Sequence, residues 1–377
     1  MTDHTHPRQT IVLATPPDSI PPAAIAQAAN LLRAGEVVAF PTETVYGLGA
    51  DATSEAALQR IFAAKGRPLS DPLIVHLADA SQLAGVARAI PPEAEQLAER
   101  FWPGPLTLVL PRLARIPALV AAGGDTVGVR VPSHPVAQAL LQAVELPIAA
   151  PSANRFMHTS PTTAAHVLAD LDGRIACILD GGPTTVGVES TVVDLTTSPP
   201  RLLRPGGVTL EALRAILPDL YVPDVPDVPD SAQNAPHRAP KSSEPATKPV
   251  HEPAHAPGQM ARHYAPHTQL IVVDAAGADA LAAMLTLAAE AQTRGERVGA
   301  LAADEEAATL EGAGVRVARL GPMDDLASIS RRLYAALREL DAAGLDLLLA
   351  HSFGRQGLGL AIEDRLRRAA GGRLHTV

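Results

Sequence analysis

Between residues 11 and 220, short continuous runs of apolar residues alternate with segments whose apolar residues have helical spacing. Short continuous runs such as PLIVHL, LTLVL, IACILD and STVVDL predict buried strands. Between such runs, SEAALQRIFAAKG places Leu58, Ile61 and Phe62 on one face of an expected helix. Gly66 is expected to end that helix, because glycine readily adopts the left-handed conformation of a helix stop. The alternation of strands and helices predicts an α/β layer fold for residues 11–220.

Other segments of the same region give further expected elements. GEVVAFPTETVYGLGA indicates a strand that ends in a turn, and VGVRVP, PIAAP and RLLRPG indicate more strands. Helices are expected in PEAEQLAERFW, VAQALLQAVE and TTAAHVLADL. Ser160 followed by Pro161 predicts a helix N-cap with proline at the first helical position.

The composition changes abruptly at residues 221–267. This segment is rich in proline and contains the repeat VPDVPDVPD, and up to residue 257 it has no Leu, Ile or Phe. Such a segment cannot bury enough apolar surface to fold, so an extended, partly polyproline-like linker is expected. Its end, APGQMARHYAP, differs because Arg262, His263 and Tyr264 can stack and hydrogen-bond. Residues 268–377 alternate strands and helices again, which predicts a smaller Rossmann-like α/β domain with a largely parallel sheet.

Bulk properties narrow the classes of function. The chain has 377 residues, 47% of them hydrophobic, but it has no continuous apolar run of about 18 residues or more, so no membrane span is expected. The first ten residues lack the features of a secretory signal, which makes a cytoplasmic location the expectation. The net charge of −9 argues against a broad basic surface for nucleic acid but permits a local cationic pocket. The one cysteine, Cys177, lies in an apolar run and is expected to be buried and inert.

Lys65 and Arg67 flank Gly66 in the stretch KGRPLSDPLIVH. A lysine in the last turn of a helix complements the negative end of the helix dipole, and this reading needs no ligand. It does not cover Arg67, which lies beyond the helix stop on a bend stiffened by Pro68. Binding of a polyphosphate ligand would account for both cations, because arginine offers a planar fork of hydrogen-bond donors and lysine offers a point charge. Both interpretations stay open on these residues alone.

A second group of polar residues lies in APSANRFMHTSPTTAAHV. Ser152 and Asn154 are two positions apart, so in an extended segment they point the same way and present a hydroxyl and an amide to one ligand. Ser160 either caps its helix or uses the same geometry to bind a phosphate. Polar side chains also stand on apolar strands, and singly each has a structural explanation. They are Thr42, Thr44, His76, Thr126, Arg130, Ser190, Thr191 and Arg204.

Taken together, Arg67, Arg130 and Arg204 stand at strand ends beside Gly or Pro turns and can gather positive potential in one cleft. The sequence has no Walker motif, no HExxH, no G-x-S-x-G and no kinase signature. A phosphate-handling enzyme built from this chain therefore has to act by positioning and charge neutralisation.

The ordered motifs PTETVYGLGADA, KGRPLSDPLIVH, WPGPLTLVL, VGVRVPSHP, APSAN…SPTT, VGVESTVVDL and LLRPGG together resemble the YrdC-like family. The linker, RHYAP and GLGLAIEDRLRRAA resemble its long two-domain form, and the likeness spans about residues 11–370. The resemblance implies a twisted open sheet with helices. It also implies an enzyme that makes L-threonylcarbamoyladenylate and pyrophosphate from L-threonine, bicarbonate and ATP, with Mg²⁺ accompanying ATP. A tRNA-modifying threonylcarbamoyl-transferase complex would take the product, and weak direct contact with tRNA is compatible with this role.

The resemblance also assigns roles to residues. Lys65 and Arg67 are expected to act in catalysis by holding phosphates, while metal ligands are not indicated. The nucleotide is expected to contact Arg67, Asp71, Thr126, Ser152, Asn154, Ser160, Arg204, His263 and Tyr264. L-Threonine is expected to contact Thr44, His76, Arg130, Ala150 and Ser190. Asp71 departs from the family, which commonly has asparagine there, and its carboxylate would repel phosphate unless Mg²⁺ or Arg67 neutralises it.

Two rival functions remain at this point. The basic cleft is also compatible with an RNA-binding module without adenylation activity, although aromatic residues for base stacking make up only 3% of the chain. A carbamoyl-phosphate or carbamoyl-transfer enzyme on a related fold is the other alternative. The second domain is expected to be a scaffold that positions the end of the linker, with a regulatory or docking unit as the alternative.

Overall fold

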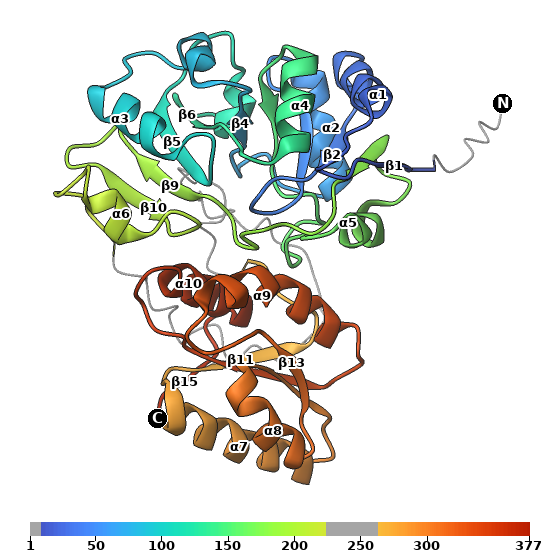
Figure 1. Ribbon diagram of the computed structural model, residues 1–377, viewed down its shortest axis with the longest axis vertical. Coiled ribbons are helices and arrows are strands. Elements are labelled where there is room, and N and C mark those ends of the chain that lie inside the picture. Colours follow the sequence, from blue (N-terminus) through green and yellow to red (C-terminus); the bar gives the residue numbers. More distant parts are fainter. Residues whose placement is uncertain (1–8, 224–262) are drawn as a thin grey trace, which may run out of the picture.

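The computed structural model describes residues 9–223 and 263–377, which form two α/β units (Figure 1). The first unit precedes residue 224 and the second begins with β11 (Gln269–Val273). Residues 263–268, called the junction segment below, lie between the two. The predicted linker falls mostly on residues 224–262, which are outside the described residues. The division of the chain at residues 220 and 268 therefore stays a prediction.

The first unit is built on a ten-stranded mixed sheet with the order β1-β8-β2-β3-β7-β4-β6-β5-β9-β10. Its strands are β1 Ile11–Ala14, β2 Val38–Phe40, β3 Gly47–Asp51, β4 Ile74–His76, β5 Leu106–Pro111, β6 Thr126–Arg130, β7 Ile148–Ala149, β8 Cys177–Asp180, β9 Thr191–Asp194 and β10 Arg201–Arg204. In the middle of the sheet β4 pairs in parallel with β6 and antiparallel with β7, so that His76 is opposite Arg130 on one side and Ile148 on the other. This register brings two polar side chains to one end of a buried sheet.

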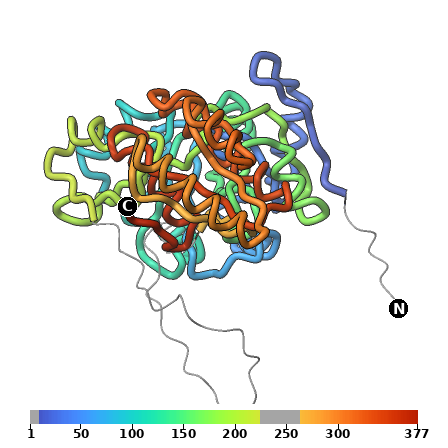
Figure 2. The backbone as a smooth tube through the Cα atoms, turned by 90° about the horizontal axis from the view of Figure 1, so that it is seen from below, coloured from blue at the N-terminus to red at the C-terminus, as the bar shows by residue number. Residues whose placement is uncertain are grey.

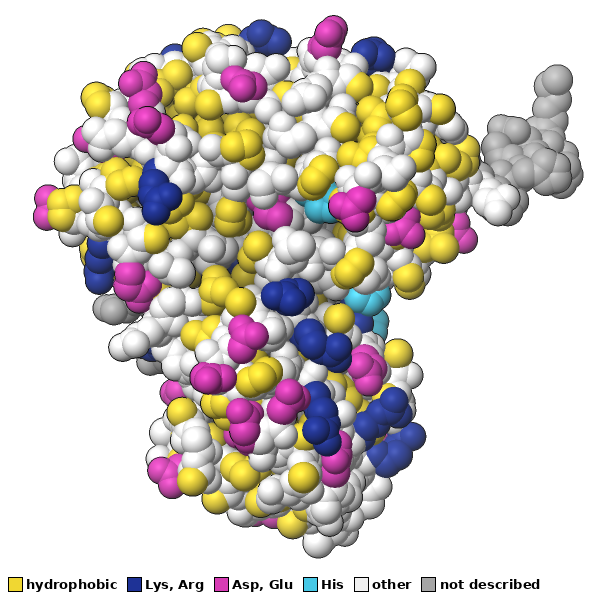
Figure 3. Space-filling model, in the orientation of Figure 1, with side chains coloured by type: hydrophobic (Ala, Val, Ile, Leu, Met, Phe, Trp, Pro, Cys, Tyr) yellow, Lys and Arg dark blue, Asp and Glu magenta, His cyan; other side chains and the backbone are white. Residues whose placement is uncertain are grey.

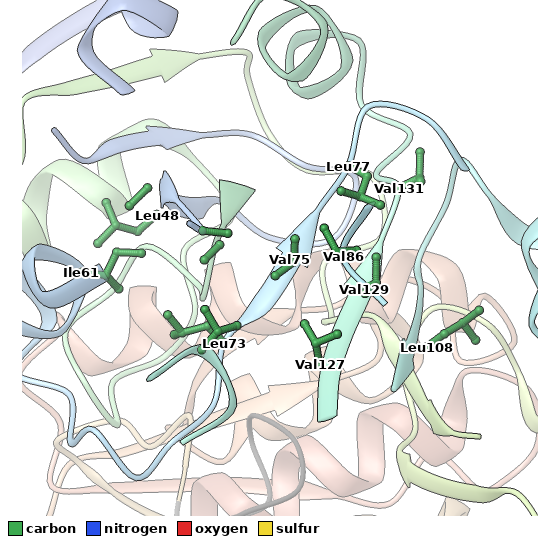
Figure 4. Close-up of a cluster of buried hydrophobic side chains, with 14 of the residues drawn as sticks. Leu48, Ile61, Leu73, Val75, Leu77, Val86, Leu108, Val127, Val129 and Val131 are labelled. Atoms are coloured by element: carbon green, nitrogen blue, oxygen red, sulfur yellow. The ribbon is translucent and has the colours of Figure 1, made fainter. Parts of the chain in front are cut away.

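Helices flank this sheet. They are α1 Pro22–Arg33, α2 Glu55–Lys65, α3 Pro92–Phe101, α4 Pro135–Val144, α5 Ala164–Leu171 and α6 Leu210–Arg214, with short 3₁₀ turns at Ala80–Gly85 and Ala118–Ala121. Figure 4 shows part of the core, where Ile61 of α2 and Leu48 of β3 lie on one side of Val75 and the side chains of Val127 and Val129 on the other. Burial of these aliphatic side chains gives the hydrophobic stabilisation that fixes the strand ends around the site.

Most predicted elements of the first unit are present, with two differences. α2 ends at Gly66 as predicted, with a φ of 66° that favours glycine. The segment GEVVAFPTETVYGLGA forms two antiparallel strands, β2 and β3, and not one strand ending in a turn. The predicted N-cap at Ser160 is wrong, because α5 begins at Ala164 and its cap is Thr163, whose side chain accepts from the His166 amide. The Ser160 hydroxyl instead donates to the Glu189 carboxylate at 2.6 Å.

The second unit has a five-stranded sheet with the order β13-β12-β14-β11-β15, and each of its pairs is parallel, which confirms the predicted parallel sheet. Its elements are β11, α7 Gly277–Thr293, β12 Val298–Ala302, α8 Asp304–Gly312, β13 Arg316–Arg319, α9 Leu326–Asp341, β14 Leu347–His351, α10 Gly359–Ala370 and β15 Leu374–His375. Helices α9 and α10 face the first unit, and α7 and α8 cover the opposite side of the sheet (Figure 1). One face of the second unit is therefore buried against the site-bearing domain.

The two units share a hydrophobic core. Val45 and Val188 of the first unit belong to the same buried cluster as residues of α9 and α10. Gly187 marks the closest approach, because a Cβ at this position would come within 2.4 Å of the Arg331 Cα, and its φ of 80° also favours glycine. From below, the orange and red segments of the second unit lie in front of the first (Figure 2). Among the described residues no helix is long and apolar enough to span a membrane.

Candidate active site

A small cavity of about 50 Å³ opens where the ends of the central strands of the first unit meet the junction segment. Its wall contains ten residues for which the sequence predicted a role in binding or catalysis, together with Thr42, which was also singled out. The ten are Thr44, Arg67, His76, Arg130, Ala150, Ser152, Ser190, Arg204, His263 and Tyr264. Thr42, Val45, Gly47, Ile74, Pro151 and Glu189 complete the lining. Residues separated by more than 200 positions in the chain thus line the same cavity.

One side of the cavity is cationic. Lys65 and Arg67 are both buried at the end of α2, and Arg67 lines the cavity together with Arg204. Burial and the neighbouring Arg67 guanidinium lower the pKa of Lys65 well below its usual value. Burial also lowers the pKa of Arg67, against the attraction of Asp71. Positive groups packed this closely without solvent create a strong potential for an anion.

Asp71 lies beside this group and forms an ion pair with Arg67, with 2.9 Å between the Arg67 Nη2 and the Asp71 Oδ2. Burial raises the pKa of Asp71, while Arg67 and Lys65 act in the opposite direction. Asp71 does not line the cavity. Arg67 therefore supplies the neutralisation that a carboxylate at this position requires.

Lys65 itself points at main-chain oxygens. Its ammonium donates to the carbonyl oxygens of Ser152 and Asn154, the latter at 2.6 Å, and lies 3.5 Å from the Asn154 Oδ1. The Asn154 amide donates to the carbonyl oxygens of Arg155 and His158. The expectation that Ser152 and Asn154 point the same way into one ligand site is wrong, because the segment turns after Ser152 and does not continue as a strand. Ser152 lines the cavity and Asn154 supports it from behind.

The other side of the cavity is formed by Thr44, His76 and Arg130. The Arg130 guanidinium donates to the Thr44 hydroxyl at 2.9 Å and to the Gly104 carbonyl at 3.2 Å, and it pairs with the Glu43 carboxylate at 2.7 Å. Burial, with Arg130 nearby, lowers the pKa of His76 to about 3. The imidazole is therefore neutral at physiological pH, and one of its nitrogens lies 3.2 Å from the Ile74 carbonyl.

The junction segment forms part of the cavity wall. His263 and Tyr264 both line it, and their ring centroids are 4.0 Å apart. Tyr264 lies between the second unit and the cavity, with the Arg365 guanidinium 5.3 Å from its ring centroid and the Tyr334 ring 5.7 Å away. Burial lowers the pKa of His263 to about 3, and its Nδ1 has no hydrogen-bond partner among the described residues. A buried, unpartnered nitrogen on the wall of a cavity is a natural contact for a ligand.

Five predicted site residues do not line the cavity: Lys65, Asp71, Thr126, Asn154 and Ser160. Thr126 borders a separate small cavity with Thr107 and Gly128. Ser160 lies behind the wall, where its hydroxyl is bound to Glu189. Both residues are close to lining residues, but neither side chain faces the main cavity in this structure.

Two acidic groups at the site were missed by sequence reasoning: Glu189, which lines the cavity, and Glu43, which pairs with the wall residue Arg130. Glu43 stands between Thr42 and Thr44, and Glu189 stands before Ser190 in the motif VGVESTVV. Both are buried and paired with arginine. Their position inside motifs already chosen for neighbouring polar residues was the available signal.

The donor set near the cavity does not resemble a metal cage. No group of three or more His, Cys, Asp or Glu side chains with metal-binding geometry occurs in residues 9–223 and 263–377. The acidic groups Asp71, Glu43 and Glu189 are each paired with an arginine. Cys177 is buried in β8, and burial raises the pKa of its thiol to about 11, so a thiolate nucleophile is not available there.

The outer surface carries mixed charge. On the face shown in Figure 3, Lys and Arg side chains are interspersed with Asp and Glu side chains over the second unit. This face shows no large cluster of a single charge sign over the second unit (Figure 3).

The fold and the cavity define an α/β protein of the YrdC-like class with a second α/β domain behind the site. Comparison with known proteins agrees. The Sua5/YciO/YrdC family model, described as telomere recombination, matches residues 30–206, and the model for the C-terminal domain of threonylcarbamoyl-AMP synthase matches residues 208–371. The chain belongs to the threonylcarbamoyl-AMP synthase family, in its two-domain form.

Relatives of this chain support the assignment over nearly its full length. The threonylcarbamoyl-AMP synthase of Pyrococcus abyssi is 45% identical over 92% of this chain and 94% of its own length. That of Bacillus subtilis is 45% identical over 93% and 94%. The crystal structure of Pyrococcus abyssi Sua5 complexed with L-threonine has a TM-score of 0.84 and 43% identity, covering 98% of this chain and all of that one.

Proposed function

We propose that this chain converts L-threonine, bicarbonate and ATP into L-threonylcarbamoyladenylate and pyrophosphate, a nucleotidyl transfer. The observation that carries the proposal is the single cavity that joins a cationic wall, with Arg67 and Arg204, to a wall of hydroxyl, imidazole and guanidinium groups. The first wall suits a polyphosphate and the second suits a small polar amino acid. Membership of the threonylcarbamoyl-AMP synthase family supports the same reaction.

The chemistry requires no nucleophile from the protein. The threonine amine adds to carbon dioxide derived from bicarbonate and loses a proton, which gives a carbamate. A carbamate oxygen then attacks the α-phosphorus of ATP, and the bond to the β-phosphate bridging oxygen breaks, releasing pyrophosphate. The protein positions the two reactants and stabilises the negative charge that develops on the phosphates. A cavity closed by His263 and Tyr264 would also protect the labile carbamate from water.

We assign the ATP side to the cationic wall. Lys65 and Arg67 are the catalytic cations, Lys65 acting on the phosphates after its carbonyl contacts rearrange. The remaining proposed nucleotide contacts are Asp71, Thr126, Ser152, Asn154, Ser160, Arg204, His263 and Tyr264. Of these, Asp71, Thr126, Asn154 and Ser160 do not line the cavity in this structure. Asp71 and Ser160 contact the wall residues Arg67 and Glu189, and Asn154 contacts Lys65.

The threonine side is assigned to Thr44, His76, Arg130, Ala150 and Ser190. Arg130 would pair with the substrate carboxylate, and neutral His76 and the hydroxyls would read its amine and side-chain hydroxyl. Mg²⁺ belongs to the substrate in this proposal, as Mg-ATP, because Asp71, Glu43 and Glu189 are each paired with an arginine and no cluster of metal ligands occurs among the described residues.

The test is pyrophosphate release that depends on all three substrates. We expect release from Mg-ATP only when threonine and bicarbonate are both present. Release without them, or none at all, would reject the reaction. Turnover of carbamoyl phosphate without threonine would instead indicate a carbamoyl-transfer enzyme. The product would be consumed by a tRNA-modifying threonylcarbamoyl transferase complex, which can be checked by adding that complex and tRNA to the reaction.

The second candidate function is an RNA-binding module. Tight tRNA binding with a steep salt dependence and no ATP turnover would favour it. We favour the enzyme, because the strongest positive groups are enclosed in the cavity where a nucleic-acid backbone cannot reach all of them. Weak tRNA contact is compatible with either function.

A further inference from the structure

The second unit reaches the cavity through one buried ion pair. The Arg365 Nε on α10 lies 2.6 Å from the Oε2 of Glu189, a residue of the cavity wall. The Tyr334 hydroxyl on α9 donates to the same carboxylate, at 2.9 Å to Oε2 and 3.1 Å to Oε1. The Ser160 hydroxyl donates to Oε1 at 2.6 Å. Three side chains, two of them from the second unit, thus hold one carboxylate in place.

Both partners of the pair are out of solvent, since Arg365 is 0% and Glu189 6% exposed. A buried ion pair gives little net stability, but removal of one partner leaves an uncompensated charge in a medium of low polarity. Arg365 also pairs with Asp364, which in turn pairs with Arg368 at 2.9 Å. Arg365 and Arg368 thus share two carboxylates, Asp364 and Glu189, and of these two arginines only Arg365 is paired with Glu189 among the ion pairs of the described residues.

Glu189 lies close to the proposed ATP side of the cavity, so its pairing with Arg365 is expected to affect ATP binding. Glu189 precedes Ser190, whose carbonyl accepts from the Arg204 Nε at 3.1 Å, and it lines the same cavity as Arg67 and Arg204. A free carboxylate there would repel a polyphosphate and attract the arginines that should bind it. With Arg365 in place, the positive potential of Arg67 and Arg204 stays available to an anion.

We propose that Arg365 is a positioning residue that cancels the charge of Glu189 at the cavity wall, so that ATP binding depends on the second unit. The inference rests on the proposed function. The second unit is in this view part of the active site and more than a scaffold for the junction segment. Tyr334 adds orientation by fixing both oxygens of Glu189, and the resulting geometry also orients Ser160.

A pH response separates charge cancellation from a merely structural role. Burial opposes ionisation of Glu189, but Arg365 and Arg204, with the Ser160 hydrogen bond, lower its pKa to about 2. The charged or titratable groups that face Glu189 are Arg365 and Asp364 from α10, Tyr334 from α9, Arg204 from β10, and His263 and Tyr264 from the junction segment. Without Arg365 the pKa rises, so acid would protonate Glu189 and relieve the repulsion.

The experiment compares Arg365→Met with Arg367→Met in the full chain. Arg367 is on the same helix but pairs with Glu363 and Asp274, away from the cavity. We expect Arg365→Met to raise the KM for ATP at least tenfold, with a smaller change in the KM for threonine. Arg367→Met should leave both nearly unchanged. In Arg365→Met the KM for ATP should fall as the pH is lowered from 8 to 6, whereas the parent chain should not show this trend.

The double variant Glu189→Gln with Arg365→Met removes both charges at similar shape. Recovery of most of the ATP affinity in this variant supports charge cancellation, and an affinity as poor as that of Arg365→Met overturns it. If Arg365→Met does not fold, Arg365→Lys and Tyr334→Phe take its place. Near-normal ATP affinity in Arg365→Lys, which keeps the positive charge, with at most a small loss in Tyr334→Phe would then support the charge role, and a loss of tenfold or more in Arg365→Lys would overturn it.

Calorimetric titration with a non-hydrolysable ATP analogue and Mg²⁺ measures nucleotide affinity without turnover. It therefore distinguishes failure of this inference from failure of the proposed function. A parent chain that makes product, with an Arg365→Met variant of unchanged ATP affinity, rejects this inference alone. A parent chain that makes no product rejects the proposed function, and the titration still reports whether Arg365 controls nucleotide affinity.

Discussion

The Lys65 ammonium donates to the Asn154 carbonyl oxygen at 2.6 Å, which joins the end of α2 to the turn that carries Ser152. The Ser152 carbonyl accepts from the same ammonium. The lysine next to the helix stop thus organises the loop that forms one edge of the cavity. Its charge lies within the field of Arg67, which is one reason that its pKa is lowered.

The first prediction is that Lys65→Ala lowers the rate of pyrophosphate release at least tenfold. Loss of the cation removes charge stabilisation at the phosphates, and removal of one such group costs about 10²–10³ in rate in comparable sites. The carbonyl oxygens of Ser152 and Asn154 also lose their donor, which should lower the free energy of unfolding by about 1–3 kcal/mol. Steady-state kinetics and denaturant unfolding measure the two effects. Arg60→Ala, on the exposed face of α2, is the control.

Substitution of Arg67 is expected to lower the rate strongly, whereas substitution of its partner Asp71 is expected to change the rate little. Arg67→Ala should lower the rate at least tenfold, because it removes a bidentate cation and leaves the buried Asp71 unpaired. Asp71→Asn keeps the shape and removes the negative charge, so we expect a rate within about threefold of the parent and an equal or lower KM for ATP. Steady-state kinetics at varied ATP concentration measure both the rate and the KM for ATP of each variant. A tenfold loss in Asp71→Asn would show that the carboxylate itself takes part.

Arg130 should control the use of threonine. Arg130→Lys keeps one charge but loses the planar fork that contacts Thr44, Gly104 and Glu43. We expect kcat/KM for threonine to fall at least tenfold, about 1.4 kcal/mol or more of transition-state stabilisation, with little change in the KM for ATP. Arg294→Lys, which is exposed in the second unit, is the control. Equal losses for both substrates would indicate general damage to the cavity.

Acid should destabilise the fold through its buried histidines. The pKa of His76 and that of His263 are each lowered to about 3 in the folded chain, against about 6.5 in the unfolded one. Below about pH 6.5 the unfolded state therefore binds protons that the folded state does not. The free energy of unfolding should fall as pH decreases from 6.5 towards 3, by up to about 1.4 kcal/mol per pH unit for each group.

Denaturant unfolding of the parent at pH 7 and pH 5 measures this loss. His76→Gln removes one of the two groups and should show a smaller loss between the same pH values. A His76→Gln variant with the same pH dependence as the parent would argue against a buried neutral imidazole at this position.

Features that depend on a few neighbouring residues could be predicted from the sequence. Gly66 after an amphipathic run predicted the end of α2, because the left-handed conformation at a helix stop depends on a single residue. The cations on both sides of it left an anion site and helix capping equally open, and the structure brings Arg67, but not Lys65, into the wall of one cavity with Arg204. The N-cap was misplaced by three residues because Ser160 and Thr163 carry equivalent hydroxyl signals, and tertiary pairing with Glu189 decided between them.

Contacts between distant segments were not predictable in the same way. Glu189 and Arg365 are 176 positions apart, and no local pattern shows that two such charges will meet out of solvent. The pairing of Glu43 with Arg130 likewise depends on where β2 and β6 lie in the sheet. Asn154 was placed in the ligand site by a two-residue period that holds only in an extended segment, and the chain turns there.

Truncation tests whether the first unit is complete by itself. A chain that ends at Pro257 lacks the wall residues His263 and Tyr264 as well as Arg365 and Tyr334. Glu189 would lose two of its partners, and Val45 and Val188 would lose the apolar surface that covers them. We expect the truncated chain to unfold at a lower temperature and to lose at least tenfold in adenylation rate. Adding Glu189→Gln to the truncated chain should recover part of the ATP affinity, since it removes the exposed charge without restoring the apolar contacts. Full activity of the truncated chain would mean that the cavity wall holds its geometry without the second unit, and that α9 and α10 serve another purpose.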